Sequence, residues 1–317
     1  MVAGDRLRIV FFGTPDFSVP TLDALVRSRH TVAAVVTQPD RPRGRGQQTT
    51  DAPVKAYAAA ARIPVLQPDR LKDAAFLETL ASAGADLGVV AAYGRILTDA
   101  VLAMPRLGLI NVHASLLPRY RGAAPVHRAI MAGERETGVT IMRVIKALDA
   151  GPMLASVRRP IGPDETSEDV ERALAKLGAG LLASTVDALA AGHVVETPQR
   201  EHDATDAPRL TREDGLIDWT ESADAVHNRV RGLHPWPQAY SHLRGQRLIV
   251  KRSQPIRDRA GDAGSVIEAS GDRLVVAAGA GSVLVAEIQP EGKRAMTPRE
   301  FLAGHAVAVG DRFTRTP

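Results

Sequence analysis

The sequence of 317 residues contains no cysteine. Disulfide bonds, thiolate-bound metal ions and a cysteine nucleophile are therefore excluded. The absence agrees with a reducing compartment, and residues 1–8 are polar and carry no secretory signal. We therefore expect a cytoplasmic protein.

Long apolar runs and two common binding signatures are also missing. No run approaches the ~20 apolar residues of a membrane helix, so we expect no membrane partner. The turn after the apolar residues 7–12 has one glycine, Gly13, in place of G-x-G-x-x-G, which argues against a dinucleotide cofactor. His113 and His127 lack a second histidine at metal-ligand spacing, so we expect no metal site.

The remaining composition is that of an ordinary globular protein, 44% apolar and 24% charged. A chain of this length forms one large or two medium domains. The net charge of +4 permits an anionic partner without requiring one. Basic residues predominate between residues 229 and 259, which contain eight Lys or Arg and a single acidic residue, Asp258.

The order of apolar segments predicts two domains. Residues 7–12, 17–26 and 31–36 have the pattern strand, helix, strand, which is the unit of a parallel sheet. Beyond the polar residues 192–208, short apolar runs alternate with glycine turns, as in a small barrel or sandwich. We therefore predict an α/β domain over residues 1–191, a linker over 192–208 and a small β-barrel domain over 209–317.

Residues 108–122 hold the first candidate functional residues. Their first half is typical of a buried strand, and the second half is a loop with Pro118 and Gly122. Asn111 and His113 interrupt the apolar run two residues apart, so both side chains point to the same side of the strand. Open α/β sheets keep their sites at this end of a strand, although a hydrogen-bonded core pair would have the same pattern.

A third candidate, Asp149, lies in a turn between the predicted strands 139–145 and 153–159. A carboxylate beside an imidazole orients the ring and favours its charged form. We interpret the three residues as an acyl-transfer site in which Asn111 and a protonated His113 donate to an oxyanion. From the residues alone, the class is an α/β transferase or hydrolase, and Asp149 could be a simple turn residue. Ser115 has no G-x-S-x-G elbow and is not interpreted as a nucleophile.

Residues 38–51 are polar and glycine-rich, and three arginines alternate in them, Arg41, Arg43 and Arg45. Such a segment buries too little apolar surface to order itself, so we expect a mobile loop. It follows a strand at the same sheet edge as the other strand ends. The segment is therefore either functional or a solvated linker.

Residues 111–125, Asn-Val-His-Ala-Ser-Leu-Leu-Pro-Arg-Tyr-Arg-Gly-Ala-Ala-Pro, closely resemble the core signature of the folate-dependent formyltransferases. The Gly-Ala-Ala-Pro ending is similar to that of the members that formylate methionyl-tRNA. The resemblance covers essentially the full length, with further matches at residues 12–17, 37–46, 92–94, 136–142, 148–151, 217–219 and 234–237.

The resemblance implies an enzyme that moves a formyl group from 10-formyltetrahydrofolate to the α-amine of methionyl initiator tRNA. It also implies a Rossmann-like sheet domain followed by an OB-like barrel. Apart from the resemblance, we expect a monomer. The family's catalytic Asn, His and Asp match Asn111, His113 and Asp149. Asn111 and His113 would then stabilise the tetrahedral oxyanion, and Asp149 would keep His113 charged.

The resemblance also implies two binding regions. The folate pocket would involve the loop residues Ser115, Leu116, Leu117 and Pro118, with Tyr93 beside them. The tRNA would contact the arginine loop and the basic face of the second domain, through Arg41, Arg43, Arg45, Arg244, Arg247, Lys251 and Arg252. Phosphate contacts would provide much of that affinity.

Two departures and three alternatives accompany this interpretation. Asp206 stands where the family usually has Tyr, and Arg209 where it has Lys, which leaves open details of the linker or of tRNA contact. The alternatives are a different amine acceptor (an amino-sugar nucleotide or glycinamide ribonucleotide), hydrolysis of the formyl donor, and a non-catalytic RNA-binding module. The sugar enzymes usually carry Arg in place of Ala123 or Ala124 and lack the arginine loop, and an RNA-binding module does not explain the three site residues.

Overall fold

The computed structural model describes the chain except residues 1–5, 41, 44–47, 50, 259–260 and 317, and it describes no side chains between 41 and 50. The chain forms two compact units. Unit 1 comprises residues 1–123, 137–159 and 171–207, and unit 2 comprises residues 124–136, 160–170 and 208–317. The domain boundaries at 191 and 209 stay a prediction.

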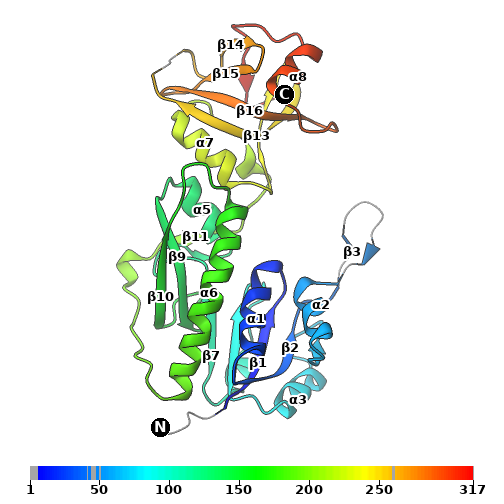
Figure 1. Cartoon of the computed structure of the whole chain (residues 1–317), viewed down its shortest axis with the longest axis vertical. Coiled ribbons are helices and arrows are strands. Elements are labelled where there is room, and N and C mark those ends of the chain that lie inside the picture. Colours follow the sequence, from blue (N-terminus) through cyan, green and yellow to red (C-terminus); the bar gives the residue numbers. More distant parts are fainter. Residues whose placement is uncertain (1–5, 41, 44–47, 50, 259–260, 317) are drawn as a thin grey trace. The chain divides into compact units, whose positions relative to one another are not determined.

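Unit 1 is built on a seven-stranded, mostly parallel sheet, as predicted (Figure 1). Its strands, in spatial order, are β10 (Met153–Pro160), β9 (Glu136–Arg143), β7 (Leu109–His113), β6 (Leu87–Ala91), β1 (Arg8–Gly13), β2 (Thr31–Val36) and β5 (Val65–Leu66). The pairs from β7 to β5 are parallel, and β9 runs antiparallel to β7. The carboxyl ends of five neighbouring strands therefore lie at one edge of the sheet, in a Rossmann-like arrangement.

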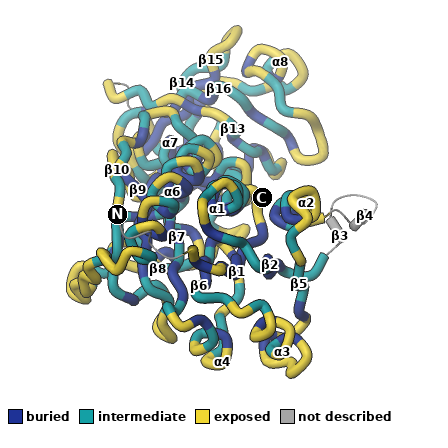
Figure 2. The backbone as a smooth tube through the Cα atoms, turned by 60° about the horizontal axis from the view of Figure 1, so that its bottom comes forward, coloured by how far each residue is buried: buried dark blue, intermediate teal, exposed yellow. Residues whose placement is uncertain are grey.

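Helices cover both faces of this sheet. On one face, Val10, Phe12 and Leu109 pack with side chains of α3 (Ala74–Ser82) and α4 (Asp99–Leu102) in one apolar cluster. On the other face, Gly178 of α6 (Ser167–Ala190) lies against Val112 and Val139. The helices α1 (Val19–Val26) and α2 (Pro53–Ala60) complete the unit. Figure 2 shows α2 with exposed residues, whereas the residues of α1 are buried or intermediate. Because strand side chains alternate, Asn111 and His113 share the face of Leu109.

One helix in the described part of the chain, α6, has the length and apolar composition of a membrane-spanning segment. Part of the apolar surface of α6 is used in packing inside unit 1. Its apolar residues Leu174, Leu182 and Val186 are fully buried, and Gly178 brings the helix backbone close to the sheet. By alternation along β7, α6 covers the face opposite to Asn111 and His113.

Unit 2 contains a six-stranded antiparallel sheet that closes on itself. Its strands, in spatial order, are β14 (Val266–Ser270), β15 (Arg273–Ala277), β16 (Ser282–Pro290), β13 (Gln246–Ile256), β12 (Ala239–Leu243) and β17 (Phe313–Thr314). A bridge between Ser265 and Arg312 joins the segments that precede β14 and β17. The two outer strands of the sheet therefore meet, and the predicted small barrel is confirmed.

The interior of this barrel is anchored by one aromatic residue. Trp219 packs against Phe313 with ring centroids 5.5 Å apart. Its indole Nε1 donates a 3.0 Å hydrogen bond to Ser241 Oγ, which donates in turn to the carbonyl of Thr314 at 2.8 Å. The indole thus fills the core while its one polar atom stays satisfied, as a buried tryptophan requires.

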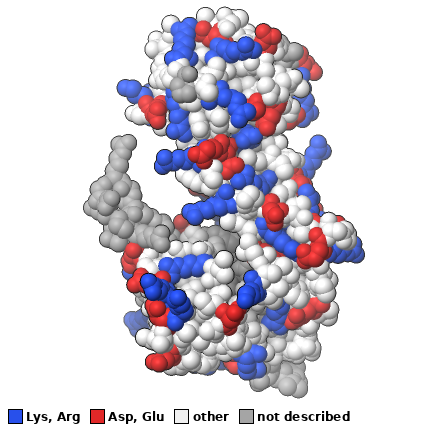
Figure 3. Space-filling view, turned by 180° about the vertical axis from the view of Figure 1, so that it is seen from behind, with Lys and Arg blue, Asp and Glu red and all other residues white. Residues whose placement is uncertain are grey.

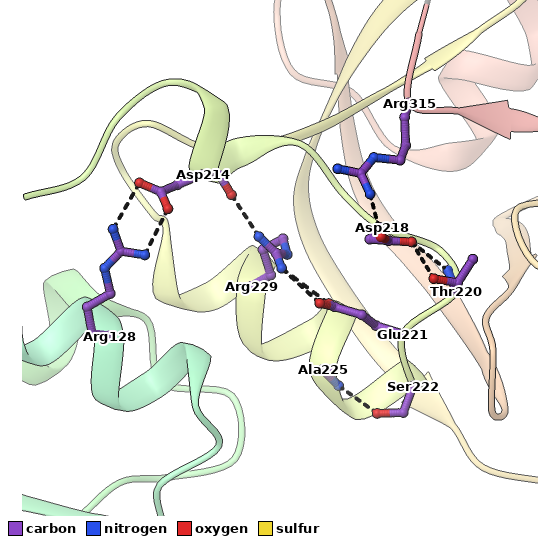
Figure 4. Close-up of polar contacts among 9 residues, drawn as sticks. All are labelled: Arg128, Asp214, Asp218, Thr220, Glu221, Ser222, Ala225, Arg229 and Arg315. Atoms are coloured by element: carbon purple, nitrogen blue, oxygen red, sulfur yellow. Dashed lines mark hydrogen bonds and ion pairs between the residues drawn. The ribbon is translucent and has the colours of Figure 1, made fainter. Parts of the chain in front are cut away.

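Unit 2 also contains α7 (Ala223–Gly232), α8 (Pro298–Gly304) and α5 (Pro125–Met131), and α5 packs on α7. The guanidinium of Arg128 on α5 binds both carboxylate oxygens of Asp214 at 2.8 and 3.0 Å (Figure 4). Arg229 on α7 donates to the carbonyl of Asp214 and to Glu221. The helix that follows the signature loop therefore lies with the C-terminal part of the chain.

The helices α7 and α8 have no counterpart in the sequence prediction for residues 209–317. Their signals are local, because each starts at a capping residue: Ser222 Oγ accepts from the backbone of Ala225, and Thr297 and Glu300 form a capping box. The short elements are the antiparallel pair β3 (Pro42–Arg43) and β4 (Gln48–Thr49) and the parallel pair β8 (Arg121–Gly122) and β11 (Asp206–Ala207).

The burial of His127 on α5 predicts that the free energy of unfolding falls in acid. Burial, and to a smaller degree the charge of Arg128, lowers the pKa of His127 from 6.5 to about 4. Between these two pH values the unfolded chain takes up a proton that the folded chain does not. Acid therefore favours unfolding, by up to about 3 kcal/mol.

Urea unfolding between pH 7 and pH 4 checks this, because the stability of His127→Gln should fall less steeply with acid than that of the wild type. His193→Gln, at an exposed position, is the control and should follow the wild type. Parallel pH curves for wild type and His127→Gln would contradict the assignment.

Candidate active site

The candidate site begins at the carboxyl end of β7. Asn111 is paired with Val90 of β6 on one side and with Met142 of β9 on the other. It is partly buried, and His113, two residues on, is 5% exposed. Ladder bonds on both sides fix the backbone of the strand. The two polar side chains therefore start from a rigid element, which is what a precise site requires.

Both ring nitrogens of His113 face oxygen atoms. Nε2 lies 2.9 Å from the carbonyl oxygen of Tyr120, and Nδ1 lies 3.7 Å from Asp149 Oδ2. A carbonyl and a carboxylate can only accept hydrogen bonds, so a doubly protonated ring presents an N–H to each. The first contact is a hydrogen bond, whereas 3.7 Å is longer than one. The structure thus brings His113 and Asp149 together, and Nδ1 is the less tightly held nitrogen.

Asp149 reaches this position from the turn between β9 and β10. Its backbone is left-handed, with φ of 47°, a conformation that costs an L-residue roughly 1 kcal/mol and that Asp tolerates better than most. The amide of Gly122 donates a 2.9 Å hydrogen bond to Asp149 Oδ2. The carboxylate, 12% exposed, is therefore fixed between the imidazole and the end of the signature loop.

The loop that follows His113 is held by Thr140 of β9. Thr140 Oγ1 donates to the carbonyl of Ser115 at 2.8 Å and accepts from the amide of Leu117 at 3.2 Å. The hydroxyl of Ser115 is buried and donates to the carbonyl of Arg119 at 2.7 Å. This hydroxyl closes the loop, which agrees with leaving Ser115 out of the nucleophile candidates. Leu117 is buried, and Leu116 and Pro118 are partly exposed.

Tyr93 lies just past the end of β6 and is almost fully buried. Its ring packs edge-on against Phe12 at 5.6 Å, and its carbonyl accepts a 2.8 Å hydrogen bond from Gln38. Burial raises the pKa of the Tyr93 phenol, an effect that the nearby Arg95 partly offsets. The ring is therefore a neutral part of the sheet face that Asn111 and His113 share.

The predicted arginine loop is described only at its base. Arg41 and Arg45 lie outside the described residues, and of Arg43 only the backbone, in β3, is described. The ammonium of Lys55 binds Asp40 on one side of the loop and Asp51, at 2.8 Å, on the other. One lysine thus holds the two ends of the segment together.

The basic stretch 229–259 has a different character in the folded unit. Five of its basic residues have acidic partners from other segments, in the pairs Arg229–Glu221, Arg244–Asp311, Arg247–Glu291, Arg252–Glu287 and Arg257–Asp224. Figure 3 accordingly shows acidic side chains beside basic ones. The charge bias of the sequence is therefore largely compensated in space.

The four predicted tRNA contacts in unit 2 differ from one another. Arg244 binds both oxygens of Asp311 at 2.9 Å and a carbonyl at 2.6 Å, which makes it part of the fold. The guanidinium of Arg247 stacks over the Tyr240 ring at 3.9 Å. Arg252 is 74% exposed and only loosely paired, at 3.6 Å, and Lys251 is partly buried. Arg252 is thus the side chain most available to a phosphate.

Sequence reasoning missed the segment 199–207, which it assigned to the linker. The segment lines the signature loop: Thr205 accepts from the amide of Arg121 at 2.8 Å, and its hydroxyl accepts from the amide of Tyr120 at 2.9 Å. Arg121 forms a bidentate pair with Glu201 at 2.8 and 2.9 Å. Asp206, one of the two departures, pairs with Arg121 in the β8–β11 ladder and has an exposed side chain. The polar composition of the segment gave no signal for these contacts.

The arrangement is that of an α/β group-transfer enzyme. The Asn111 amide and the His113 imidazole stand on one face at the carboxyl end of β7, where they can donate to a carbonyl oxygen as it gains charge. The Asp149 carboxylate lies beside the imidazole. Within the described residues, no group of three or more His, Asp or Glu side chains could hold a metal ion. The donor set suits a neutral acyl group.

The chain belongs to the formyl transferase family. The family's formyl transferase model matches residues 7–186, and the model of its C-terminal domain matches residues 209–306. A methionyl-tRNA formyltransferase of Moorella thermoacetica is 47% identical over 306 residues, 96% of this chain and 98% of the relative. The protein of the same name from Citrifermentans bemidjiense is 48% identical over 306 residues, 96% of this chain and 95% of the relative.

Solved structures show the same fold at much lower identity. An N-formyltransferase of Helicobacter canadensis, in complex with folinic acid and dTDP-3-aminofucose, has a TM-score of 0.67 at 16% identity, covering 90% of this chain and all of that one. HypX of Aquifex aeolicus, in complex with tetrahydrofolic acid, has a TM-score of 0.63 at 17% identity, covering 96% of this chain and 48% of that one.

The geometry predicts that Gly122 cannot be replaced. With φ of 121°, a Cβ at this position would lie 2.7 Å from the carbonyl oxygen of Ala207, so Gly122→Ala forces β8 away from β11 and from Asp149. Gly192→Ala is the matched control, because Gly192 also has a positive φ, of 70°, but nothing within 4 Å. The control should lose about 1 kcal/mol in urea unfolding, and Gly122→Ala should lose clearly more. Equal losses would contradict the close approach.

Proposed function

We propose that the protein transfers the formyl group of 10-formyltetrahydrofolate to the α-amine of methionyl initiator tRNA. The observation that carries the proposal is the near full-length similarity to proteins named methionyl-tRNA formyltransferase. The positions of Asn111, His113 and Asp149 also support the proposal, because these residues can stabilise the charges that develop in the reaction. The proposed product is formylmethionyl-tRNA, which serves translation initiation.

The roles of the three residues follow from charge development in the reaction. The neutral amine attacks the formyl carbon and the carbonyl oxygen becomes an oxyanion. When this intermediate collapses, the bond to the donor nitrogen breaks, the amine loses a proton and the leaving nitrogen gains one. The amide of Asn111 and an N–H of His113 stabilise the oxyanion. Free α-amines titrate at roughly 7.7–8.0, so enough neutral amine is present near neutral pH.

Asp149 keeps His113 oriented and charged in this scheme. The carboxylate already accepts from Gly122, so it is fixed before the substrate arrives. At 3.7 Å the carboxylate makes no hydrogen bond to Nδ1, so this N–H is open to a substrate oxygen. The Tyr120 carbonyl meanwhile holds Nε2. We therefore assign the oxyanion contact of His113 to Nδ1.

Substrate binding is assigned as the resemblance implies. The folate donor lies against the Ser115–Pro118 loop and Tyr93, and the tRNA contacts the segment with Arg41, Arg43 and Arg45 together with unit 2. Lys55, which binds Asp40 and Asp51, supports the idea that this segment leaves the fold at a fixed point. In unit 2 we favour Arg252 over Arg244, since Arg244 is bound on two sides. The proposal includes a monomeric cytoplasmic enzyme.

The test is to incubate the pure protein with 10-formyltetrahydrofolate and charged initiator tRNA and to analyse the amino acid on the tRNA. Formyl-methionine is the expected product. An arm without tRNA measures the release of formate, and an arm with amino-sugar nucleotides measures transfer to a different amine. Formate release alone, or transfer to the sugar alone, would overturn the proposal in favour of a hydrolase or a sugar enzyme.

Replacing His113 tests the oxyanion role. His113→Ala removes one donor to the transition state and should lower kcat by about 10²–10³. His193→Ala, at an exposed position, is the control and should have wild-type kcat. Single-turnover formylation with saturating donor is the measurement. A kcat within twofold of wild type would remove His113 from the mechanism.

Replacing the three loop arginines tests tRNA binding. Arg41, Arg43 and Arg45 together changed to Ala should raise KM for tRNA about 10-fold and weaken its salt dependence, because fewer phosphates are neutralised. Binding of the folate donor should be unchanged. The control of equal charge is Arg62, Arg70 and Lys72 changed to Ala, three exposed positions in unit 1. Equal effects in both triple variants would show that only net charge matters.

A further inference from the structure

One side chain of the segment 199–207 connects the two halves of the site. The amide nitrogen of Gln199 donates to the carbonyls of Asp149 and Gly151, both at 2.8 Å. Its amide oxygen accepts a 3.0 Å hydrogen bond from Arg121 Nε. Gln199 therefore uses both N–H groups on the turn that carries Asp149 and its oxygen on the loop that follows His113.

These contacts complete a closed ring of hydrogen bonds. Gln199 binds the backbone of Asp149, the Asp149 carboxylate binds the amide of Gly122, and the neighbouring residue Arg121 returns to Gln199. Arg121 is itself held by Glu201, and its side chain is only 10% exposed. Each member is thus fixed from two directions, and no member can move without breaking a bond of another.

The turn that Gln199 binds is one that needs support. Asp149 has left-handed backbone geometry, and such residues persist where their surroundings determine them. Two residues later, a Cβ on Gly151 would lie 2.0 Å from the carbonyl of Arg143, so the chain passes very close to the end of β9. The carbonyls of Asp149 and Gly151 in this turn both accept hydrogen bonds from the Gln199 amide.

We propose that Gln199 is a positioning residue for Asp149: its side-chain amide sets the turn of residues 149–151 so that the carboxylate meets both His113 and Gly122. The expected effect of Gln199 on the reaction rate rests on the proposed function. Its expected effect on the structure of the turn rests on the hydrogen bonds alone. Gln199 touches no reacting atom in this assignment. It acts only through the carboxylate of Asp149.

The structural consequence is tested by hydrogen exchange in Gln199→Met, which keeps the length of the side chain and removes its donors and acceptor. Exchange should become faster in peptides covering residues 119–122 and 147–152 and stay unchanged in unit 2. Gln289→Met is the matched control, since Gln289 also donates to a backbone carbonyl, that of Lys293, at 2.8 Å. Unchanged exchange at 147–152 in Gln199→Met overturns the proposal, whether or not the protein formylates tRNA.

The kinetic consequence is tested by a double-mutant cycle with Asp149→Asn. Gln199→Met alone should lower kcat about 10-fold, as expected when a catalytic group is displaced, with KM for both substrates within twofold of wild type. In the Asp149→Asn background the same change should have less than a twofold effect, because Gln199 then has no carboxylate to position. Full additivity, or an effect on KM alone, overturns the positioning role.

A third variant separates the two sides of the Gln199 amide. Gln199→Glu keeps an acceptor for Arg121 and loses the donors to Asp149 and Gly151. It should therefore resemble Gln199→Met in kcat. Wild-type kcat in Gln199→Glu would show that the Arg121 contact is the important one and would overturn the role assigned to the turn. Absence of formyl transfer in the wild type would instead contradict the proposed function and leave the exchange result as the test of the positioning.

Discussion

The hydrogen bond from the Gly122 amide to the Asp149 carboxylate is the contact on which the arrangement of the site depends. It joins the loop after β7 to the turn after β9, two segments that the sheet alone does not bring together. It also fixes the carboxylate beside His113, which the Tyr120 carbonyl holds from the other side. Gly122 has a positive φ, and a Cβ added to it would lie 2.7 Å from the carbonyl oxygen of Ala207. Only glycine therefore permits this approach.

The same loop also connects the site to unit 2. Residue 123 ends the first part of unit 1, and the next residue starts the part of unit 2 that contains α5. Arg128 then binds Asp214 in a bidentate pair, and α5 packs on α7. The signature loop is therefore held at one end by β7 and continues at the other into a helix of the C-terminal unit.

Much of the site could be predicted from sequence, and the reasons are physical. Asn111 and His113 interrupt an apolar strand at period two, and the parallel pattern places such residues at the carboxyl edge. Asp149 is a weaker candidate from the residues alone, since an aspartate in a turn is common, and the family resemblance supports it. Gln199 and Thr205 could not be found, because they act through hydrogen bonds between segments distant in sequence. The compensation of charge in the basic stretch 229–259 could not be found for the same reason: its acidic partners, such as Asp311 and Glu221, lie outside it. That this stretch contacts tRNA stays a prediction.

The most direct measurement is a crystal structure of the protein with 5-formyltetrahydrofolate, a formylated folate related to the proposed donor. We expect the folate to lie against the Ser115–Pro118 loop and Tyr93, with its formyl-bearing edge toward Asn111 and His113. We also expect the Asn111 amide and His113 Nδ1 to stand about 3 Å from one ordered oxygen at that edge. A folate bound away from these residues, or an Asn111 side chain turned toward the core, would contradict the assignment of the site.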